Sequence, residues 1–176
     1  MRFALREILI TLLLALLIFL VAQAALQSCV VVGSSMEPNL YGGQRLLVSK
    51  AAYWFGSPRR GDVIVFHSPE NLEHDLIKRV IALPGETVEI REGKVYIDGR
   101  YLPEDYVLEQ PGYTLPSQVV PADCYFVLGD NRNHSSDSHV WGMLPGEYII
   151  GKAWLCYWPL SQWHLAPNVP DPLAAP

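Results

Sequence analysis

The segment 87-TVEIREGKVYIDG-99 decides the fold class, because it contains two short strand patterns joined by a tight turn. Apolar and polar residues alternate through 87–91 and again through 94–98, which is the period of a strand with one buried face. The pairs Glu92-Gly93 and Asp98-Gly99 end each run with a glycine, as hairpin turns commonly do. The segment therefore predicts consecutive antiparallel hairpins.

Further strand patterns lie on both sides of this segment, separated by turn residues. No internal repeat and no long amphipathic helix pattern follows residue 28. Fourteen prolines and thirteen glycines among 176 residues also favour many turns. We therefore predict an all-β body of antiparallel sheets. The additional strand patterns cover residues 45–49, 62–67, 76–83, 125–130 and 148–158.

These patterns divide the chain into four parts. The insert is more polar than its flanks, and the tail is rich in proline, which favours an extended or disordered segment. The expected parts are a membrane anchor with its flank at 1–28, a β core formed by 29–84 plus 119–165, a hairpin-rich insert at 85–118 and a proline-rich tail at 166–176.

Residues 8–26 read ILITLLLALLIFLVAQAAL, an apolar run long enough to cross a bilayer as a helix. Arg2 and Arg6 precede it, so the positive-inside tendency predicts a single-pass membrane protein with a cytoplasmic N-terminus. The β body would then lie on the outer side, periplasmic or lumenal. The competing interpretation is a cleavable signal peptide, because 22-AQA-24 fits an A-x-A cleavage pattern. Both interpretations place the body outside the cytoplasm.

Charge and cysteine content argue against two classes of function. The net charge is -5 and no long basic run occurs, so nucleic acid is not the expected partner. Cys29, Cys124 and Cys156 form no C-x-x-C pair and lack metal-ligand spacing, and we expect neither a metal nor another cofactor. A disulfide between Cys124 and Cys156 and a set of buried free thiols both remain open.

The segment 33-GSSMEPNL-40 offers two adjacent serines where the chain leaves the apolar run. A serine hydroxyl is a weak nucleophile unless a base takes its proton. The G-x-S-x-G pattern of α/β-hydrolases is absent. One alternative is a histidine triad that uses Asp137 and His139, and the other is a lysine base.

Lys78 is the candidate lysine, because 75-DLIKRVIALPGE-86 places it inside an apolar strand pattern on one face with Leu76 and Val80. Burial disfavours the charged ammonium, and lowering its pKa from about 10.4 to about 8 costs about 3 kcal/mol. The neutral amine can accept a serine proton. The alternative is an edge-strand lysine whose ammonium reaches water.

A third segment, 128-LGDNRNHSSDSHVWGMLP-145, is dense in carboxylates, amides and hydroxyls directly after an apolar strand pattern. A solvated loop also uses such residues as turn formers. Loops on a rigid β scaffold are, however, where catalytic groups commonly lie. The segment is therefore a candidate for the rest of a catalytic site.

Four segments of the chain resemble, in order, the sequence boxes of type I signal peptidases, the membrane-bound Ser/Lys endopeptidases. The resemblance extends from residue 33 to about residue 145 and implies the antiparallel β fold of that family. The form 135-SSDSHVWG-142 looks closest to the cyanobacterial and chloroplast branch. The four segments are 34-SSMEPNL-40, 60-RGDVIVF-66, 78-KRVIALPGE-86 and 129-GDNRNHSSDS-138.

The resemblance implies roles for individual residues. Ser35 matches the nucleophile, Lys78 the general base and Ser135 the hydroxyl that orients the lysine, whereas Ser34 matches none of them. Gly33 stands where some members carry a serine of the oxyanion hole, which leaves the second donor beside the Ser35 N–H unassigned. The other matched positions are Asp130 and Asp137, expected to pair with Arg79 or Arg132, and Met36, Pro38 and Val80, expected to shape the loop and the substrate pockets.

Two positions depart from the family pattern: Asn39 stands where threonine is common, and His139 stands where many bacterial members have arginine. His139 can still donate a hydrogen bond to Asp137. The resemblance implies removal of signal peptides from exported preproteins after small residues at -1 and -3. It also implies the lipid bilayer and the secretion translocon as candidate partners. The alternative is an anchored β domain that only binds partners, which the loss of Ser35 or Lys78 would signal.

Overall fold

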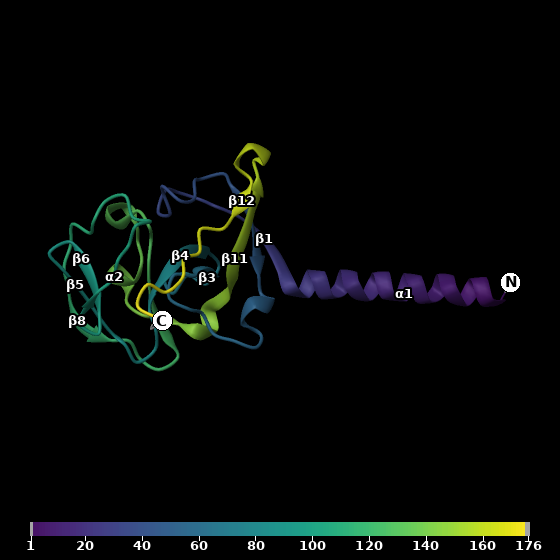
Figure 1. Cartoon of the computed structure of the whole chain (residues 1–176), viewed down its shortest axis with the longest axis horizontal. Coiled ribbons are helices and arrows are strands. Elements are labelled where there is room, and N and C mark those ends of the chain that lie inside the picture. The colour runs from purple at the N-terminus through teal and green to yellow at the C-terminus, as the bar shows by residue number, and fades with distance from the viewer. Residues whose placement is uncertain (1, 175–176) are drawn as a thin grey trace.

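The computed structural model describes residues 2–174, and it shows a β domain with one helix projecting from it (Figure 1). Met1, Ala175 and Pro176, the ends of the predicted anchor and tail, lie outside the described residues. The two sheets are antiparallel throughout, and the helices after residue 28 are single turns. The all-β prediction is therefore confirmed.

The larger sheet has the order β1-β2-β11-β3-β4-β9-β10, and β12 pairs with β11. The long strand β11 pairs with β2, β3 and β12, so it joins the two halves of this sheet. The strands of this sheet are β1 (Leu26–Val30), β2 (Arg45–Ser49), β3 (Val63–His67), β4 (Asp75–Ala82), β9 (Cys124–Leu128), β10 (Leu144–Pro145), β11 (Ile149–Trp158) and β12 (His164–Leu165).

The smaller sheet has the order β7-β6-β5-β8 and contains the hairpin that the sequence predicts. Val88 faces Ile97 and Ile90 faces Val95 across that hairpin, and all four side chains are buried. They pack against the end of β4 and against β9, so the two sheets share a core. The strands of this sheet are β5 (Thr87–Arg91), β6 (Lys94–Ile97), β7 (Arg100–Tyr101) and β8 (Leu115–Val119).

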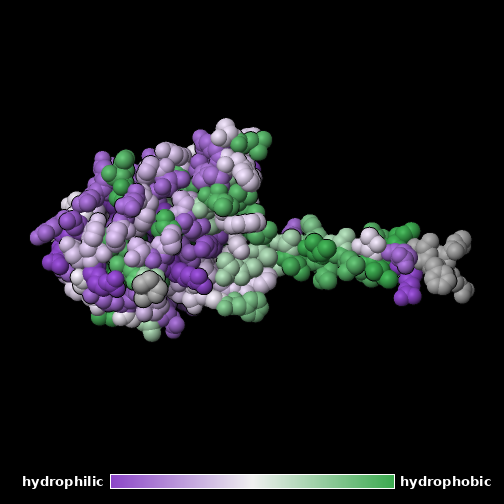
Figure 2. All heavy atoms as spheres, in the orientation of Figure 1, coloured by the Kyte–Doolittle hydropathy of each residue, from purple (hydrophilic) through white to green (hydrophobic). Residues whose placement is uncertain are grey.

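Helix α1 (Arg2–Ala25) projects from the domain, and its apolar side chains from Ile8 to Val21 are exposed (Figures 1 and 2). It is the one helix among the described residues that is long and apolar enough to cross a membrane, by length and composition. Strand β1 follows it without a linker, and Lys50 N donates to the Ala25 carbonyl. The helix therefore leaves the domain directly from the larger sheet.

Residues 166–174 contain no helix or strand, yet this segment packs on the domain. Ala166 is buried in the core, and Leu173 packs against the cluster shared by the two sheets. The prolines hold the segment out of regular structure, while its side chains and carbonyls bond to the body. The cysteines are free thiols, and Cys124 and Cys156 lie in different core clusters.

Candidate active site

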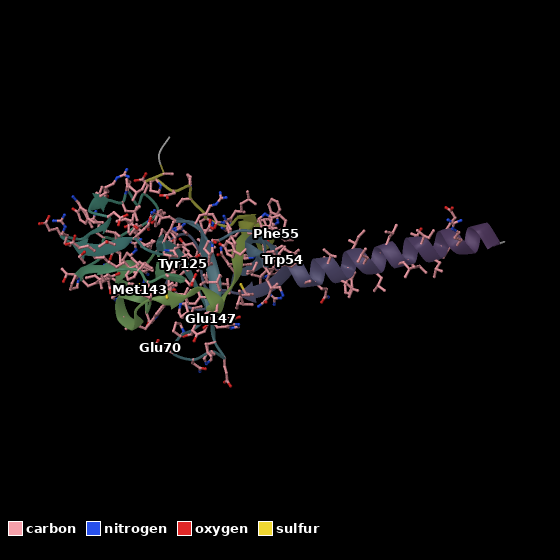
Figure 3. All side chains as sticks on the ribbon, turned by 90° about the horizontal axis from the view of Figure 1, so that it is seen from below. Trp54, Phe55, Glu70, Tyr125, Met143 and Glu147 are labelled. Atoms are coloured by element: carbon pink, nitrogen blue, oxygen red, sulfur yellow. The ribbon has the colours of Figure 1, made fainter. Side chains whose placement is uncertain are left out.

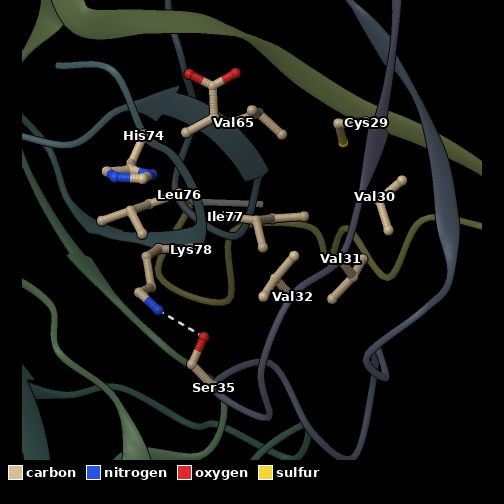
Figure 4. A pocket seen from close by; sticks show the side chains of 11 residues that line it. Cys29, Val30, Val31, Val32, Ser35, Val65, His74, Leu76, Ile77 and Lys78 are labelled. Atoms are coloured by element: carbon tan, nitrogen blue, oxygen red, sulfur yellow. Dashed lines mark hydrogen bonds between the residues drawn. The ribbon is translucent and has the colours of Figure 1, made fainter.

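The hydroxyl of Ser35 and the amine of Lys78 meet at the surface of the larger sheet. Ser35 lies on the loop between β1 and β2, and Lys78 lies at the middle of β4. The Lys78 Nζ donates a hydrogen bond of 2.6 Å to the Ser35 Oγ (Figure 4). Two residues far apart in the sequence are thus placed at the distance over which a proton can pass.

The lysine is buried, with 3% of its surface exposed. Burial lowers the pKa of Lys78 to about 8, against the opposing influence of the Asp137 and Asp130 carboxylates. An amine with this pKa is neutral in about a tenth of the molecules at pH 7 and in about half at pH 8, whereas an ordinary lysine is almost entirely charged at both. The neutral amine can then accept a proton from the serine hydroxyl.

Asp130 and Arg79 form a buried bidentate ion pair beside Lys78. Arg79 Nε donates to Asp130 Oδ1 at 2.8 Å and Arg79 Nη2 donates to Oδ2 at 2.6 Å. Both side chains have 0% of their surface exposed. Asn39, on the Ser35 loop, donates its Nδ2 to the same Asp130 Oδ2 at 2.8 Å. The carboxylate therefore ties the lysine strand to the serine loop.

Asp137 is buried and caps the short helix α2 (Ser138–Trp141). It accepts from the backbone N–H groups of Gly129 and His139, at 2.9 Å and 3.2 Å. The Asp137 Oδ1 is also 2.7 Å from the His139 ring nitrogen Nδ1, the contact that the sequence allowed. Asp137 thus pairs with His139. The predicted pairing of Asp137 with Arg79 or Arg132 is wrong.

The partner of Arg132 also differs from the prediction, which was Asp130 or Asp137. The Arg132 guanidinium makes two hydrogen bonds of 2.7 Å to the carboxylate of Glu104, and its Nε donates to the Gly129 carbonyl. Glu104 lies in the predicted insert, after β7. Sequence spacing gave no sign of this partner, because the contact joins two loops whose relative position depends on how the sheets pack.

Gly129 lies between the serine loop and Ser135. A Cβ added to Gly129 would lie 2.3 Å from the Ser135 Oγ and 2.5 Å from the Ser35 carbonyl oxygen. The same carbonyl accepts from the backbone N–H of Asn131 at 3.0 Å. Ser135 Oγ is buried and has no hydrogen-bond partner among the described residues, so the expected bond to Lys78 is not made here.

A cleft of about 320 Å³ opens beside Ser35 and Lys78 (Figure 4). One wall is the edge of β1 with the residues that follow it, and the other is β4 with Val65 of β3. Burial raises the pKa of the cleft residue Cys29 to about 11, so its thiol is not an activated nucleophile. Apolar lining is supplied by Val30, Val31, Val32, Leu76 and Ile77.

The sequence model described as "Signal peptidase, peptidase S26" matches residues 4–158 of the chain. The chain belongs to this signal peptidase family. It is 54% identical over 136 residues to the probable signal peptidase I-1 of Synechocystis sp., which covers 73% of the chain and 69% of that protein. Members of family S26 are serine endopeptidases, and the chain is therefore a serine endopeptidase.

More distant relatives agree with this assignment. The thylakoidal processing peptidase 1 of Arabidopsis thaliana is 40% identical over 139 residues, which cover 73% of the chain and 41% of that protein. The chain therefore spans less than half the length of that relative. A crystal structure of a signal peptidase I from Enterococcus faecalis V583 has a TM-score of 0.51 and 38% identity, and covers 55% of the chain and 96% of that structure.

The residues expected to shape the substrate pockets lie elsewhere in this signal peptidase family member. Met36 is buried in a core cluster with Leu40 and Leu46. Val80 is buried in another cluster, and Pro38 lines a separate hollow with Tyr41. Alternation along β4 places Leu76 and Lys78 on one face, and this signal could have identified Leu76 as a cleft residue. No sequence pattern identified Val31 and Val32, which follow β1, as cleft residues, because the apolar run gives no sign of where the helix ends and β1 begins.

The histidine alternative is not supported by the geometry. The Asp137–His139 pair exists, but the other partner of the His139 ring is Tyr113, stacked on it with a centroid separation of 3.9 Å. Among residues 6–174, whose side chains are described, no histidine hydrogen-bonds the Ser35 hydroxyl. The same part of the chain contains no group of three His, Cys, Asp or Glu residues that could hold a metal ion.

Proposed function

We propose that the chain is a membrane-anchored signal peptidase that cleaves exported preproteins with Ser35 as nucleophile and Lys78 as general base. One observation carries this proposal: the 2.6 Å contact between the Ser35 hydroxyl and the buried Lys78 amine. A nucleophile needs a base within hydrogen-bonding reach, and a base needs a pKa near the working pH. Burial of Lys78 supports the second requirement.

Acylation begins with neutral Lys78, to whose Nζ the Ser35 hydroxyl donates. Lys78 takes the hydroxyl proton while Ser35 Oγ forms a bond to the scissile carbonyl carbon. The oxyanion of the tetrahedral intermediate accepts from the Ser35 backbone N–H. The lysine ammonium then gives its proton to the leaving amine as the peptide bond breaks. The product is an ester between Ser35 and the signal peptide.

Deacylation repeats these steps with water. Lys78, neutral again, takes a proton from a water molecule whose oxygen attacks the ester carbonyl. The ester bond breaks, and the Ser35 oxygen recovers the proton from Lys78. Asp130 and Asp137 are proposed to order the two loops around this chemistry. Ser135, whose hydroxyl has no partner among the described residues and lies against Gly129, is proposed to orient the lysine during the reaction.

The substrate is proposed to bind as an extended strand in the cleft. Strand β1 pairs with β2 along one edge only, and its other edge faces the cleft, so it can accept the backbone of a peptide. Valine side chains leave shallow, apolar pockets beside Ser35. We propose that these pockets favour small residues at -1 and -3, because the valine side chains beside Ser35 limit their depth.

The membrane is proposed to hold α1, with the domain on the outer side. Trp54 and Phe55 lie near the end of α1 (Figure 3), and 51% and 100% of their surfaces are exposed. About half or more of the surface of each of three further tryptophans is also exposed: Trp154, Trp158 and Trp163. Tryptophan and other aromatic side chains are favoured at a bilayer surface. The short connection from α1 to Ser35 keeps the dyad within about 30 Å of chain from the membrane.

The test is cleavage of a preprotein by the full chain in lipid vesicles, compared with Ser35→Ala and Lys78→Ala. We expect each variant to lose at least about 10³-fold in kcat, since nucleophile and base act as one unit. Ser34→Ala is the matched control and should retain cleavage. Full activity in Lys78→Ala would exclude the lysine mechanism.

The anchor is tested separately by washing membranes that contain the chain with alkaline carbonate. A spanning helix should keep the protein in the pellet. Release of a product that lacks residues 1–24 would favour the signal-peptide interpretation. Vesicle binding by a variant without residues 1–28 measures the aromatic surface alone, and a variant that stays wholly in solution would exclude that interface.

A further inference from the structure

Arg79 is held by more groups than its ion pair with Asp130 requires. Its Nη1 donates to two backbone carbonyls, Gly61 at 3.0 Å and Pro167 at 2.6 Å. The ring of Tyr106 covers the guanidinium, with 4.1 Å between Cζ and the ring centroid. Because the side chain is fully buried, each of these partners replaces a water molecule that the guanidinium has lost.

The Pro167 carbonyl comes from the proline-rich tail, here the tail segment 166–173, which lies beyond the part matched by the family model, residues 4–158. Asn168 anchors this segment with two hydrogen bonds of 2.8 Å. Its Oδ1 accepts from the Val63 N–H and its Nδ2 donates to the Ala153 carbonyl. Asp171 adds an ion pair with Arg60, 2.8 Å long.

The body is shaped to receive the tail segment. A Cβ at Gly61 would lie 2.3 Å from the Val169 carbonyl oxygen, so only glycine allows this approach. The Val169 N–H donates to the Gly61 carbonyl at 3.2 Å. Gly61 therefore contacts both the tail segment and Arg79, and couples the position of one to the other.

We propose that the tail segment is a positioning element for the proposed nucleophile Ser35, acting through Arg79, Asp130 and Asn39; this inference rests on the proposed function. The Pro167 carbonyl fixes the Arg79 guanidinium, which holds both oxygens of Asp130. Asp130 in turn accepts from Asn39, four residues after Ser35. Without the tail segment, the guanidinium loses its shortest carbonyl partner and the pair can tilt toward solvent.

The expected consequence is a loss in kcat rather than in substrate binding. The tail segment does not line the cleft, so KM should stay within about twofold. A displacement of the serine by about 1 Å can reduce the chemical step by about 10²-fold. Truncation after Leu165 and the substitution Asn168→Ala both loosen the tail segment, and the second keeps the chain at full length.

The experiment measures kcat and KM for preprotein cleavage by the full chain and by Asn168→Ala. The temperature is one at which thermal unfolding curves show both proteins to be folded. We expect kcat to fall by about tenfold or more with KM unchanged. Val95→Ala is the control, because it weakens the core under the smaller sheet and does not touch Arg79. It should lower the unfolding temperature and leave kcat unchanged.

A double-mutant cycle with Asn39→Ala separates positioning from general destabilisation. If both changes act through Asp130, the double variant should lose less kcat than the product of the two single losses. Losses that multiply fully, or an Asn168→Ala variant with unchanged kcat, would overturn the inference. Its failure is distinct from that of the proposed function, which would show as cleavage by Ser35→Ala.

Discussion

The carboxylate of Asp137 and the ring of His139 are 2.7 Å apart, two residues from each other in the chain. The negative charge of Asp137 opposes the fall in the pKa of Lys78 that burial causes. A cation beside Asp137 weakens that opposition, and the removal of the ring strengthens it. A substitution at His139 should therefore change the pKa of Lys78 through Asp137, without touching Lys78 itself.

We predict that His139→Arg shifts the acid limb of the kcat/KM profile to lower pH, and that His139→Ala shifts it to higher pH. The arginine carries a permanent positive charge and lowers the pKa of Lys78 by offsetting the charge on Asp137. The measurement is kcat/KM for preprotein cleavage at about ten pH values between pH 6 and pH 10. Shifts of equal sign in the two variants would contradict the electrostatic argument.

The unmodified chain should itself show a base of depressed pKa. Lys78 must be neutral to accept the Ser35 proton, so kcat/KM should rise with pH and reach half its maximum near the pKa of Lys78, about 8. A midpoint above about 10, the value of an ordinary lysine, would contradict the lowered pKa of the proposed base.

Burial of Lys78 also predicts a cost to stability. The pKa of Lys78 is about 8 in the folded chain and 10.5 for an ordinary lysine, so between these pH values the unfolded chain binds more protons than the folded one. Stability from this group should therefore rise with pH through that window and be lowest below it. Lys78→Met should raise the free energy of unfolding by about 3 kcal/mol at pH 7 while it abolishes cleavage. Urea unfolding at pH 7 and pH 10 measures both effects, and equal stability of Lys78→Met and the parent at pH 7 would contradict the prediction.

Gly129→Ala should reduce cleavage by at least about 10²-fold, because the new Cβ must displace the Ser35 carbonyl, the Ser135 hydroxyl or both. Gly56→Ala is the matched control, since its Cβ would meet nothing closer than the Ala52 carbonyl at 3.9 Å. The kcat of each variant is compared with that of the parent. Equal activity in both variants would show that the loop moves without cost.

The fold was predictable where side chains alternate. The hairpin of β5 and β6 begins and ends close to the predicted residues, because tight turns and one buried face determine its register. Strand β8 gave no such signal, since Pro116 interrupts its pattern. It lies at the edge of the smaller sheet, where a missing N–H is tolerated.

The candidate site was predictable in part as pairs: the contacts Lys78–Ser35, Arg79–Asp130 and His139–Asp137 were among those expected, and the partner of Arg132 was not. Lys78 stood out because an ammonium on an apolar strand is unusual. The partner of Arg132 could not be predicted, because Glu104 lies in a loop of the smaller sheet that reaches the site only through tertiary packing. The tail shows the same limit: its prolines predicted an extended or disordered segment, but the contacts of Asn168 depend on where β3 and β11 lie in the folded chain.

Glu104→Ala should destabilise the fold strongly, since it leaves a buried guanidinium without its partner. The side chain of Arg132 has 0% of its surface exposed, and that of Glu104 has 10%. Breaking one side of a buried pair costs about 3–5 kcal/mol, because the remaining charge has lost both water and partner. Glu89→Ala is the matched control: its pair with Arg91 is 3.4 Å long and joins an exposed arginine to a half-buried glutamate, so its loss should cost less than about 1 kcal/mol. Urea unfolding of the two variants gives the comparison, and a Glu104→Ala loss as small as that of Glu89→Ala would mean that water reaches Arg132.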